Sequence, residues 1–185
     1  MAPGASARDT SQDAVFASAF EAMDKLIGSD ASFRAEFAAA TGVNLARLES
    51  AYPRATWEKG LPIAARRLFP ALPRDEALYA LGQKTIDRYK EGVIGLALFA
   101  LLRVIGPMRA LARTRRNFRT ANNYTECRLT VRGPKEVLMW MNELDFRAYT
   151  AGVVQAGTAL TGAKNVKVEV QGVEGDGTNF LVTWE

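Results

Sequence analysis

Apolar residues recur at helical spacing through most of the first 120 positions of the chain. The first stripe runs from Phe16 to Ile27 and ends at Gly28. The same spacing predicts a helix capped by Asp30, one that begins at Tyr52-Pro53 and contains Pro62 as a potential break, and one opened by Pro73. Further helical segments are predicted to follow from Val93 and from Pro107 to Phe118.

After Asn122 the period changes from helical to alternating. Strands are predicted over 124–131 and 137–141, a helix over 146–160, and two more strands over 166–170 and 180–184, with a hairpin loop at 172–179. The run 137–141 is apolar on both faces and is therefore expected in the centre of the sheet. The order predicts an α+β fold in which N-terminal helices pack on a C-terminal antiparallel sheet of β-β-α-β-β order. We expect a disordered tail at 1–13 and a single domain at 14–185.

The run from Val93 to Leu102 contains no polar side chain. It is too short to cross a bilayer, which takes about 20 apolar residues. A helix that is apolar on every side is usually covered on every side, so the sequence predicts that this helix is buried in the core. Gly92 and Gly95 are expected where a neighbouring helix approaches closely.

The basic residues gather directly after this run. The chain has 24 Lys and Arg residues against 20 Asp and Glu, a net charge of +4. Six arginines and no acid lie between 103 and 119, and without those six the net charge of the remaining chain is −2. Arginine suits planar contacts with carboxylate or phosphate groups. The candidates for an anion-binding surface are Arg113, Arg115, Arg116 and Arg119; the alternative is a solvated helix face with a few structural ion pairs.

Three further sites each have two interpretations. Asn122, Asn123 and Tyr124 either form a structural junction between helix and strand or point into a pocket beside the arginines. Cys127 is expected to face the core as an inert thiol; its alternative, acylation, is implied only by the resemblance to vesicle-tethering subunits given below. The three tryptophans, Trp140 among them, are expected in the core rather than as ligand platforms.

Several kinds of chemistry are excluded or disfavoured by composition. The chain contains no His and one Cys, which removes His-dependent catalysis, His-ligated haem and disulfides. No phosphate-binding loop, dinucleotide fingerprint or paired catalytic carboxylates are found, so no enzyme is predicted. The N-terminus lacks the pattern of a secretory signal, which predicts a cytoplasmic protein without a transmembrane segment.

Several stretches resemble a known family. They are the segment from Tyr52-Pro53 to Trp57, LPIAARRLFPALPRDEALYALG, EGVIGLALFALLRVIGPMR and above all RNFRTANNYTECRLT. These stretches resemble a myxobacterial (Myxococcus-type) paralogous family of uncharacterised proteins, over roughly Phe16 to Glu185, with Ala121 where Gly is frequent. The element order is also similar to the superfamily of haem-nitric-oxide sensors, four-vinyl-reductase domains and vesicle-tethering subunits. That likeness implies helices over an antiparallel sheet that enclose an apolar channel.

The sequence therefore favours a non-enzymatic ligand-binding or signalling module. Its apolar pocket would be lined by Leu98, Leu102, Cys127 and Trp140, with the arginines at the mouth. No cofactor is predicted, although a bound lipid or small apolar molecule, or an anionic ligand, fits this arrangement. The alternative is a protein–protein adaptor, a homodimer that binds an acidic partner. Nucleic acid is disfavoured because no known motif frames the aromatic residues.

Overall fold

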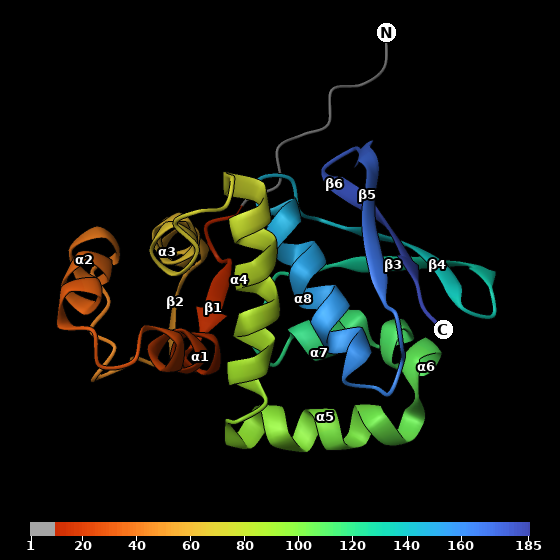
Figure 1. Ribbon diagram of the computed structural model, residues 1–185, viewed down its shortest axis with the longest axis horizontal. Helices are drawn as coiled ribbons and strands as arrows, with labels where there is room; N and C mark the ends of the chain where they lie inside the picture. The colour runs from red at the N-terminus through yellow and green to blue at the C-terminus, as the bar shows by residue number, and fades with distance from the viewer. Residues whose placement is uncertain (1–9) are drawn as a thin grey trace, which may run out of the picture.

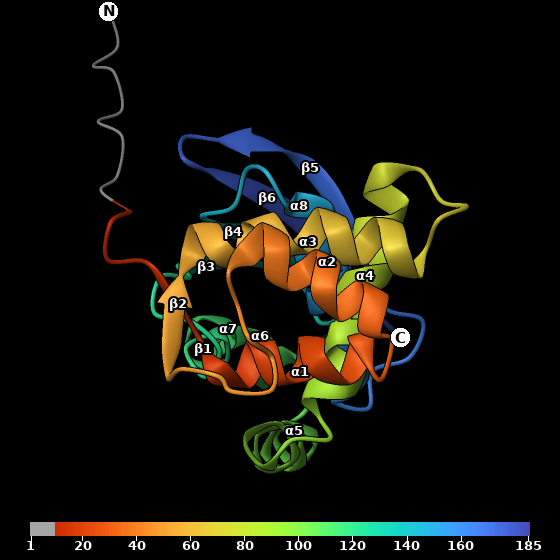
Figure 2. The same cartoon turned by 90° about the vertical axis from the view of Figure 1, so that its left-hand side faces the viewer.

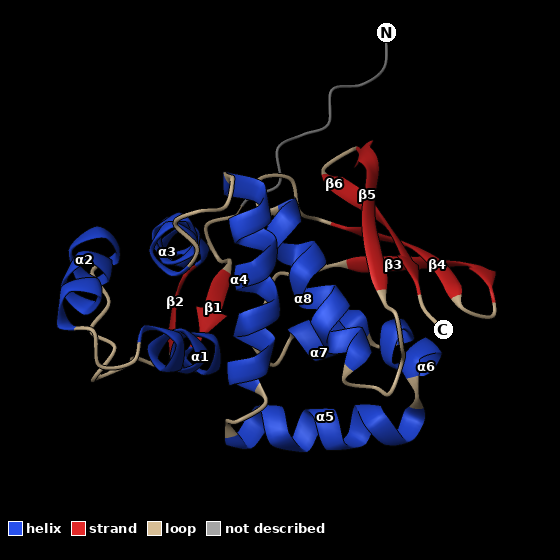
Figure 3. Ribbon diagram, viewed as in Figure 1, coloured by secondary structure: helices blue, strands red, loops and turns tan. Residues whose placement is uncertain are grey.

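The computed structural model describes residues 10–185 and has the predicted α+β architecture (Figures 1 and 3). The helices, in chain order, are α1 (Ala17–Ile27), α2 (Ala31–Thr41), α3 (Arg54–Leu68), α4 (Arg74–Tyr89), α5 (Val93–Ile105), α6 (Pro107–Ala112), α7 (Thr114–Phe118) and α8 (Arg147–Ala159). The strands are β1 (Ala14–Phe16), β2 (Ala51–Pro53), β3 (Cys127–Gly133), β4 (Glu136–Met141), β5 (Lys167–Glu174) and β6 (Gly177–Thr183). The predicted order β-β-α-β-β is confirmed from β3 to β6.

The C-terminal sheet has the strand order β3-β4-β6-β5, with every neighbouring pair antiparallel. The predicted central position of 137–141 is confirmed, because β4 lies between β3 and β6. Alternate residues of β4 and β6 are fully buried, among them Val137, Met139 and Phe180, in the core shared with α8. The other residues of β4 are only half-buried, so one face of this strand is less covered than its apolar sequence suggests. The hairpin between β5 and β6 is tighter than expected, since the strands extend to Glu174 and from Gly177.

The N-terminal helices form a second core. Phe20, Phe37, Leu61, Leu78 and Leu81 are fully buried where α1, α2, α3 and α4 meet. Burying an aromatic or aliphatic side chain of this size contributes about 1.5–3 kcal/mol. Figure 1 shows α1, α2 and α3 on one side of α4 and the C-terminal sheet on the other.

Two details of this layer differ from the sequence-based expectation. The short strands β1 and β2 pair with each other and were not predicted, since three residues are too few to show a period. Pro62 does not divide α3, which runs unbroken past it to Leu68.

Helices α4 and α8 join the two halves and pack unusually closely. A Cβ atom at Gly82 of α4 would overlap the carbonyl oxygen of Tyr149, and one at Gly152 of α8 would overlap that of Tyr79. Each glycine thus lets the backbone of the facing helix approach it directly. This contact fixes the distance between the helical layer and the sheet.

The prediction that the run from Val93 to Leu102 is a buried core helix is wrong in one respect. The segment is helical, but α5 lies along the bottom edge of the molecule, beneath the ends of α4 and α8 (Figures 1 and 2). Only Gly95 and Leu102 are buried, whereas Val93 is 87% and Val104 84% exposed. The expected close approach at Gly95 is present, because a Cβ atom there would overlap Tyr89. The inner face of α5 packs on the domain as predicted, and its outer face is not covered by the described chain.

Most of the predicted N-terminal tail lies outside the described residues. Of its described part, Asp13 is buried and its carboxylate lies 3.7 Å from Arg54.

Candidate ligand pocket

A pocket of about 160 Å³ lies between the two halves of the molecule. Most of the lining comes from α4, the inner face of α5, the stretch from Ala110 to Thr125, and α8, and further lining residues come from β1, α1, α3 and the stretch from Met141 to Phe146. The apolar lining comes mainly from Ile86, Leu98, Phe99, Leu102, Leu111, Phe118, Met141, Val153 and Val154. An apolar cavity of about this volume in another protein stays dry and admits benzene.

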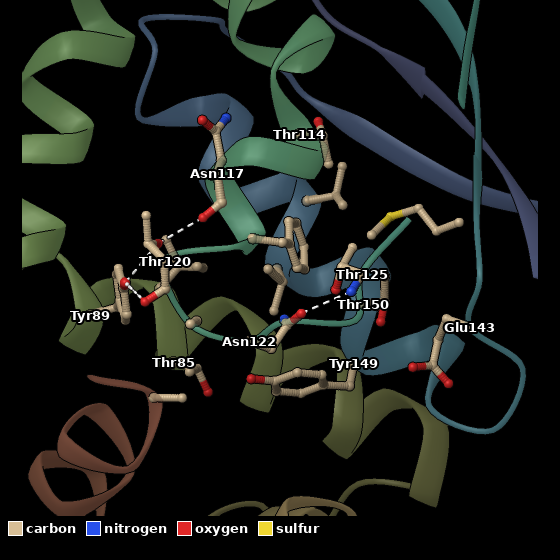
Figure 4. A pocket seen from close by; sticks show the side chains of 18 of the residues that line it. Thr85, Tyr89, Thr114, Asn117, Thr120, Asn122, Thr125, Glu143, Tyr149 and Thr150 are labelled. Carbon is tan, nitrogen blue, oxygen red and sulfur yellow. Dashed lines mark hydrogen bonds between the residues drawn. The ribbon is translucent and has the colours of Figure 1, made fainter. Parts of the chain in front are cut away.

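One wall is held by a hydrogen bond between distant segments. The Tyr89 hydroxyl, at the end of α4, lies 2.9 Å from Oγ1 of Thr120. The Thr120 hydroxyl also donates a hydrogen bond of 2.7 Å to the carbonyl oxygen of Asn117. Figure 4 shows this chain of contacts at the edge of the pocket. It connects α4 to the segment that follows α7.

The segment from Thr114 to Thr125 presents several of its uncharged polar residues to the pocket. Thr114, Asn117 and Thr120 recur every third residue and line the pocket. Asn122 closes the segment, because its Oδ1 accepts the N–H groups of Tyr124 (3.1 Å) and Thr125 (2.9 Å). This is the Asx-type turn expected of Asn at a junction. Asn122 is thereby both a structural junction residue and a pocket residue.

Two hydroxyl groups face the pocket without an internal partner. Thr125 and Thr150 are 5% and 6% exposed, and neither hydroxyl has a hydrogen-bond partner among the described residues. Figure 4 shows the two side chains next to each other, one from the start of the sheet segment and one from α8. A hydroxyl that lines a pocket and has no partner within the protein can bond a solvent molecule or a polar group of a ligand, so this pair is a natural place for such a group.

A charged cluster around Arg54 forms one end of the pocket. The Arg54 guanidinium lies 2.6 Å from Glu58, 3.5 Å from Glu143 and 4.6 Å from the centre of the Tyr124 ring. Burial raises the pKa of the Glu143 carboxyl, although the N–H of Phe146 and the charge of Arg54 oppose that rise. Burial also raises the pKa of the Tyr124 hydroxyl, against the effect of Arg54. The single guanidinium is already shared by acidic groups, so this end does not attract an anion.

The predicted arginines face away from the pocket. Arg113, Arg115, Arg116 and Arg119 are exposed, and none of them lines the cavity. Arg115 and Arg119 both pair with Glu126, at 2.8 and 2.7 Å, which matches the alternative of structural ion pairs. Among the described residues, Arg113 and Arg116 form no ion pair.

The other candidate residues divide between the pocket and its surroundings. Leu98, Leu102, Asn122 and Tyr124 line the pocket. Asn123 is exposed and bonds the backbone of Gln12 and Ala14. Cys127 and Trp140 do not line it: Cys127 is half-buried against the sheet core, and Trp140 stacks under Arg128 at 4.0 Å and bonds the carbonyl oxygen of Glu174.

The sequence did not predict a role for Thr125, Thr150 or the Arg54 cluster. Only the three-residue spacing of Thr114, Asn117 and Thr120 was a usable signal for the pocket. The other residues come together through the packing of α8 on α4, which no local pattern reveals.

The fold is similar to that of H-NOX domains. The Fe(II) unliganded H-NOX protein from K. algicida is similar over 92% of this chain and 96% of its own, with a TM-score of 0.62 at 11% identity. An H-NOX protein from S. oneidensis in the Fe(II)NO ligation state is similar over 92% and 99%, with a TM-score of 0.62 at 10% identity. At these identities the likeness concerns the fold alone.

The chain belongs to the family described as "Protein of unknown function (DUF2378)", whose model matches residues 8–185. No curated protein matches the chain. The link to myxobacteria stays a prediction.

The haem that this fold class suggests does not fit the residues present. Haem iron is held by His, Cys, Met or Tyr. The chain has no His, and Cys127 lies outside the pocket. Burial raises the pKa of the Tyr149 hydroxyl, which the nearby Thr85 side chain only partly offsets, and this disfavours the phenolate that would bind iron. The thioether of Met141 is the remaining soft donor in the lining, and no Lys or Arg there would pair with the haem carboxylates. In the described residues, no group of three or more Asp, Glu and Cys side chains is placed to hold a metal ion.

Proposed function

We propose that this protein is a ligand-binding signalling module whose pocket takes a small, neutral, mostly apolar molecule. The observation that carries the proposal is the pair of hydroxyls, Thr125 and Thr150, which form no hydrogen bond within the described residues and line a mostly apolar pocket. Binding pockets commonly combine an apolar lining with a few polar groups that fix the orientation of the ligand. The ligand would place one hydrogen-bonding group against these hydroxyls.

The charge of the lining favours a neutral ligand. The lining residues include Glu58 and Glu143 but no Lys or Arg. A free carboxylate or phosphate would lose its hydration there without gaining a counter-charge. We therefore assign no anion to this pocket, and an anion contact of the arginines stays a prediction for the outer surface.

Helix α5 would transmit ligand binding in the pocket to the outer surface of the domain. Its inner residues Leu98, Phe99 and Leu102 line the pocket, while its outer residues face away from the domain. A ligand that fills the space beneath α5 would change how firmly this helix rests on the domain. The module would act by binding and movement rather than by catalysis. The adaptor that binds an acidic partner as a homodimer stays a prediction.

The test compares two probes that differ by one hydroxyl. Benzene and phenol are titrated into isotope-labelled protein, and the NMR shifts of residues around the pocket are followed. We expect both to bind, and we expect Thr125→Val/Thr150→Val to weaken phenol by about tenfold while leaving benzene within about twofold.

The matched control is Thr130→Val, which makes the same change at an exposed position of β3 outside the pocket. It should alter neither affinity. The proposal fails if neither probe shifts the pocket residues, or if phenol loses no affinity in the double variant.

A further inference from the structure

Helix α5 carries five of the ten exposed large hydrophobic residues of the described chain, and they form its outer face: Val93, Ile94, Leu96, Leu101 and Val104. These five side chains are between 49% and 87% exposed. Val93 and Val104 lie opposite the buried Gly95 and Leu102, and Ile94, Leu96 and Leu101 lie on the flanks of the helix. Soluble domains scatter single apolar residues over their surface, but a continuous row of them marks an interaction site.

Two exposed arginines lie at the C-terminal end of this face. Arg103 is the only charged residue of α5 and is exposed. Arg109 follows on α6, which begins where α5 ends (Figure 1) and is also exposed. Within residues 10–185, neither forms an ion pair. The acids nearest in sequence are Glu91, which pairs with Arg88, and Glu126, which pairs with Arg115 and Arg119.

We propose that α5 docks this protein on the surface of a membrane that contains anionic lipids. The outer face of α5 would enter the boundary between head groups and acyl chains, and Arg103 and Arg109 would contact the lipid phosphates. An exposed apolar helix face beside basic residues is the pattern of helices that lie in a membrane interface. No helix in the described part of the chain is long and apolar enough to span a bilayer, so α5 would lie on the surface.

A second copy of the chain fits this face less well. A stable dimer takes about 20–30 residues from each partner, and a helix of 13 residues is only about 20 Å long. Pairing two copies along α5 would also bring two Arg103 side chains into one interface, where like charges repel. A lipid surface has neither constraint, because it is continuous and negatively charged.

The experiment is flotation of the full chain with vesicles of phosphatidylcholine, with or without about one third phosphatidylglycerol. We expect binding to the anionic vesicles and little to pure phosphatidylcholine. Leu96→Gln/Val104→Gln should reduce binding at least about tenfold, and Arg103→Gln/Arg109→Gln should reduce it and flatten its salt dependence. All four side chains are exposed, so both variants should fold, which circular dichroism verifies.

The matched control is Val131→Gln/Val173→Gln, which replaces two valines that are 63% and 56% exposed on the sheet. It should bind the anionic vesicles within about twofold of the wild type. The proposal is overturned if the wild type does not float with anionic vesicles, or if the α5 variant floats equally well. It is also overturned if light scattering finds a dimer that the α5 variant abolishes, since a second copy would then cover this face. None of these results depends on a ligand in the pocket.

Discussion

Gly82 of α4 and Gly152 of α8 each accept the backbone of the other helix in the place where a side chain would stand. The contact is reciprocal, since a Cβ atom at either glycine would overlap a carbonyl oxygen of the facing helix. Because backbone atoms cannot swing aside as a flexible side chain can, this crossing sets the width of the pocket next to it.

Gly82→Ala and Gly152→Ala should therefore destabilise the protein by about 1–3 kcal/mol each, as expected for overpacking in a tight core. Gly157→Ala is the control within α8, because nothing lies within 4 Å of the position of its Cβ. It should be neutral or stabilising by up to about 1 kcal/mol. Urea denaturation of the three variants checks this, and equal stabilities for all three would contradict a tight crossing.

The acid sensitivity of α2 should depend on Asp30. Its Oδ1 accepts the N–H of Phe33 at 2.9 Å, and this bond, followed by that from Ser32, lowers the pKa of Asp30 to about 2. Because the pKa of Asp30 is lower in the folded state than its ordinary value of 3.8, the ionised carboxylate stabilises the folded protein at pH values above 3.8. This stabilisation is lost as the pH falls from 3.8 towards about 2. Asp30→Asn keeps a cap acceptor but removes the titration. The wild type should lose more stability than this variant in that window of an acid unfolding series; parallel curves would argue against the assignment.

Cys127 should be a slow nucleophile in the folded protein. Burial, with a smaller effect of Glu126, raises the pKa of its thiol to about 12. At pH 8 the thiolate fraction would then be on the order of 10⁻⁴, and only the thiolate reacts. Iodoacetamide should label the protein far more slowly in buffer than in concentrated urea. Rapid labelling of the folded state would show an accessible, reactive thiol and would contradict an inert Cys127.

The two halves of the fold were predictable from the sequence for different reasons. Long periodic segments such as Arg74–Tyr89 and the alternating strands after Asn122 carry their structure locally, and the β-β-α-β-β order follows from them. The pocket could not be predicted from local patterns, because its residues come from distant parts of the chain. Tyr89 and Thr120, for example, are 31 residues apart and meet only after α4 and α7 have packed.

Helix α5 shows what a hydrophobic pattern along the sequence does not determine. A helix that is apolar on all sides is expected to be covered on all sides, but its sequence does not specify whether the same domain or another partner covers each side. The domain covers Gly95 and Leu102, and the outer row from Val93 to Val104 is left to something outside the described chain. The arginines were likewise placed correctly on the surface, while the inward side of the same segment, with Thr114 and Asn117, was overlooked.

The most direct test of the account is native mass spectrometry of the protein purified from its own cells, beside a Gly157→Leu variant. Gly157 lines the pocket and has open space at its Cβ position, so the leucine side chain would occupy the ligand volume without displacing backbone. We predict that the wild type carries a small neutral molecule, that unfolding releases it, and that the variant lacks it. A wild type that carries no such molecule, or a variant that carries it equally, would contradict a ligand in this pocket.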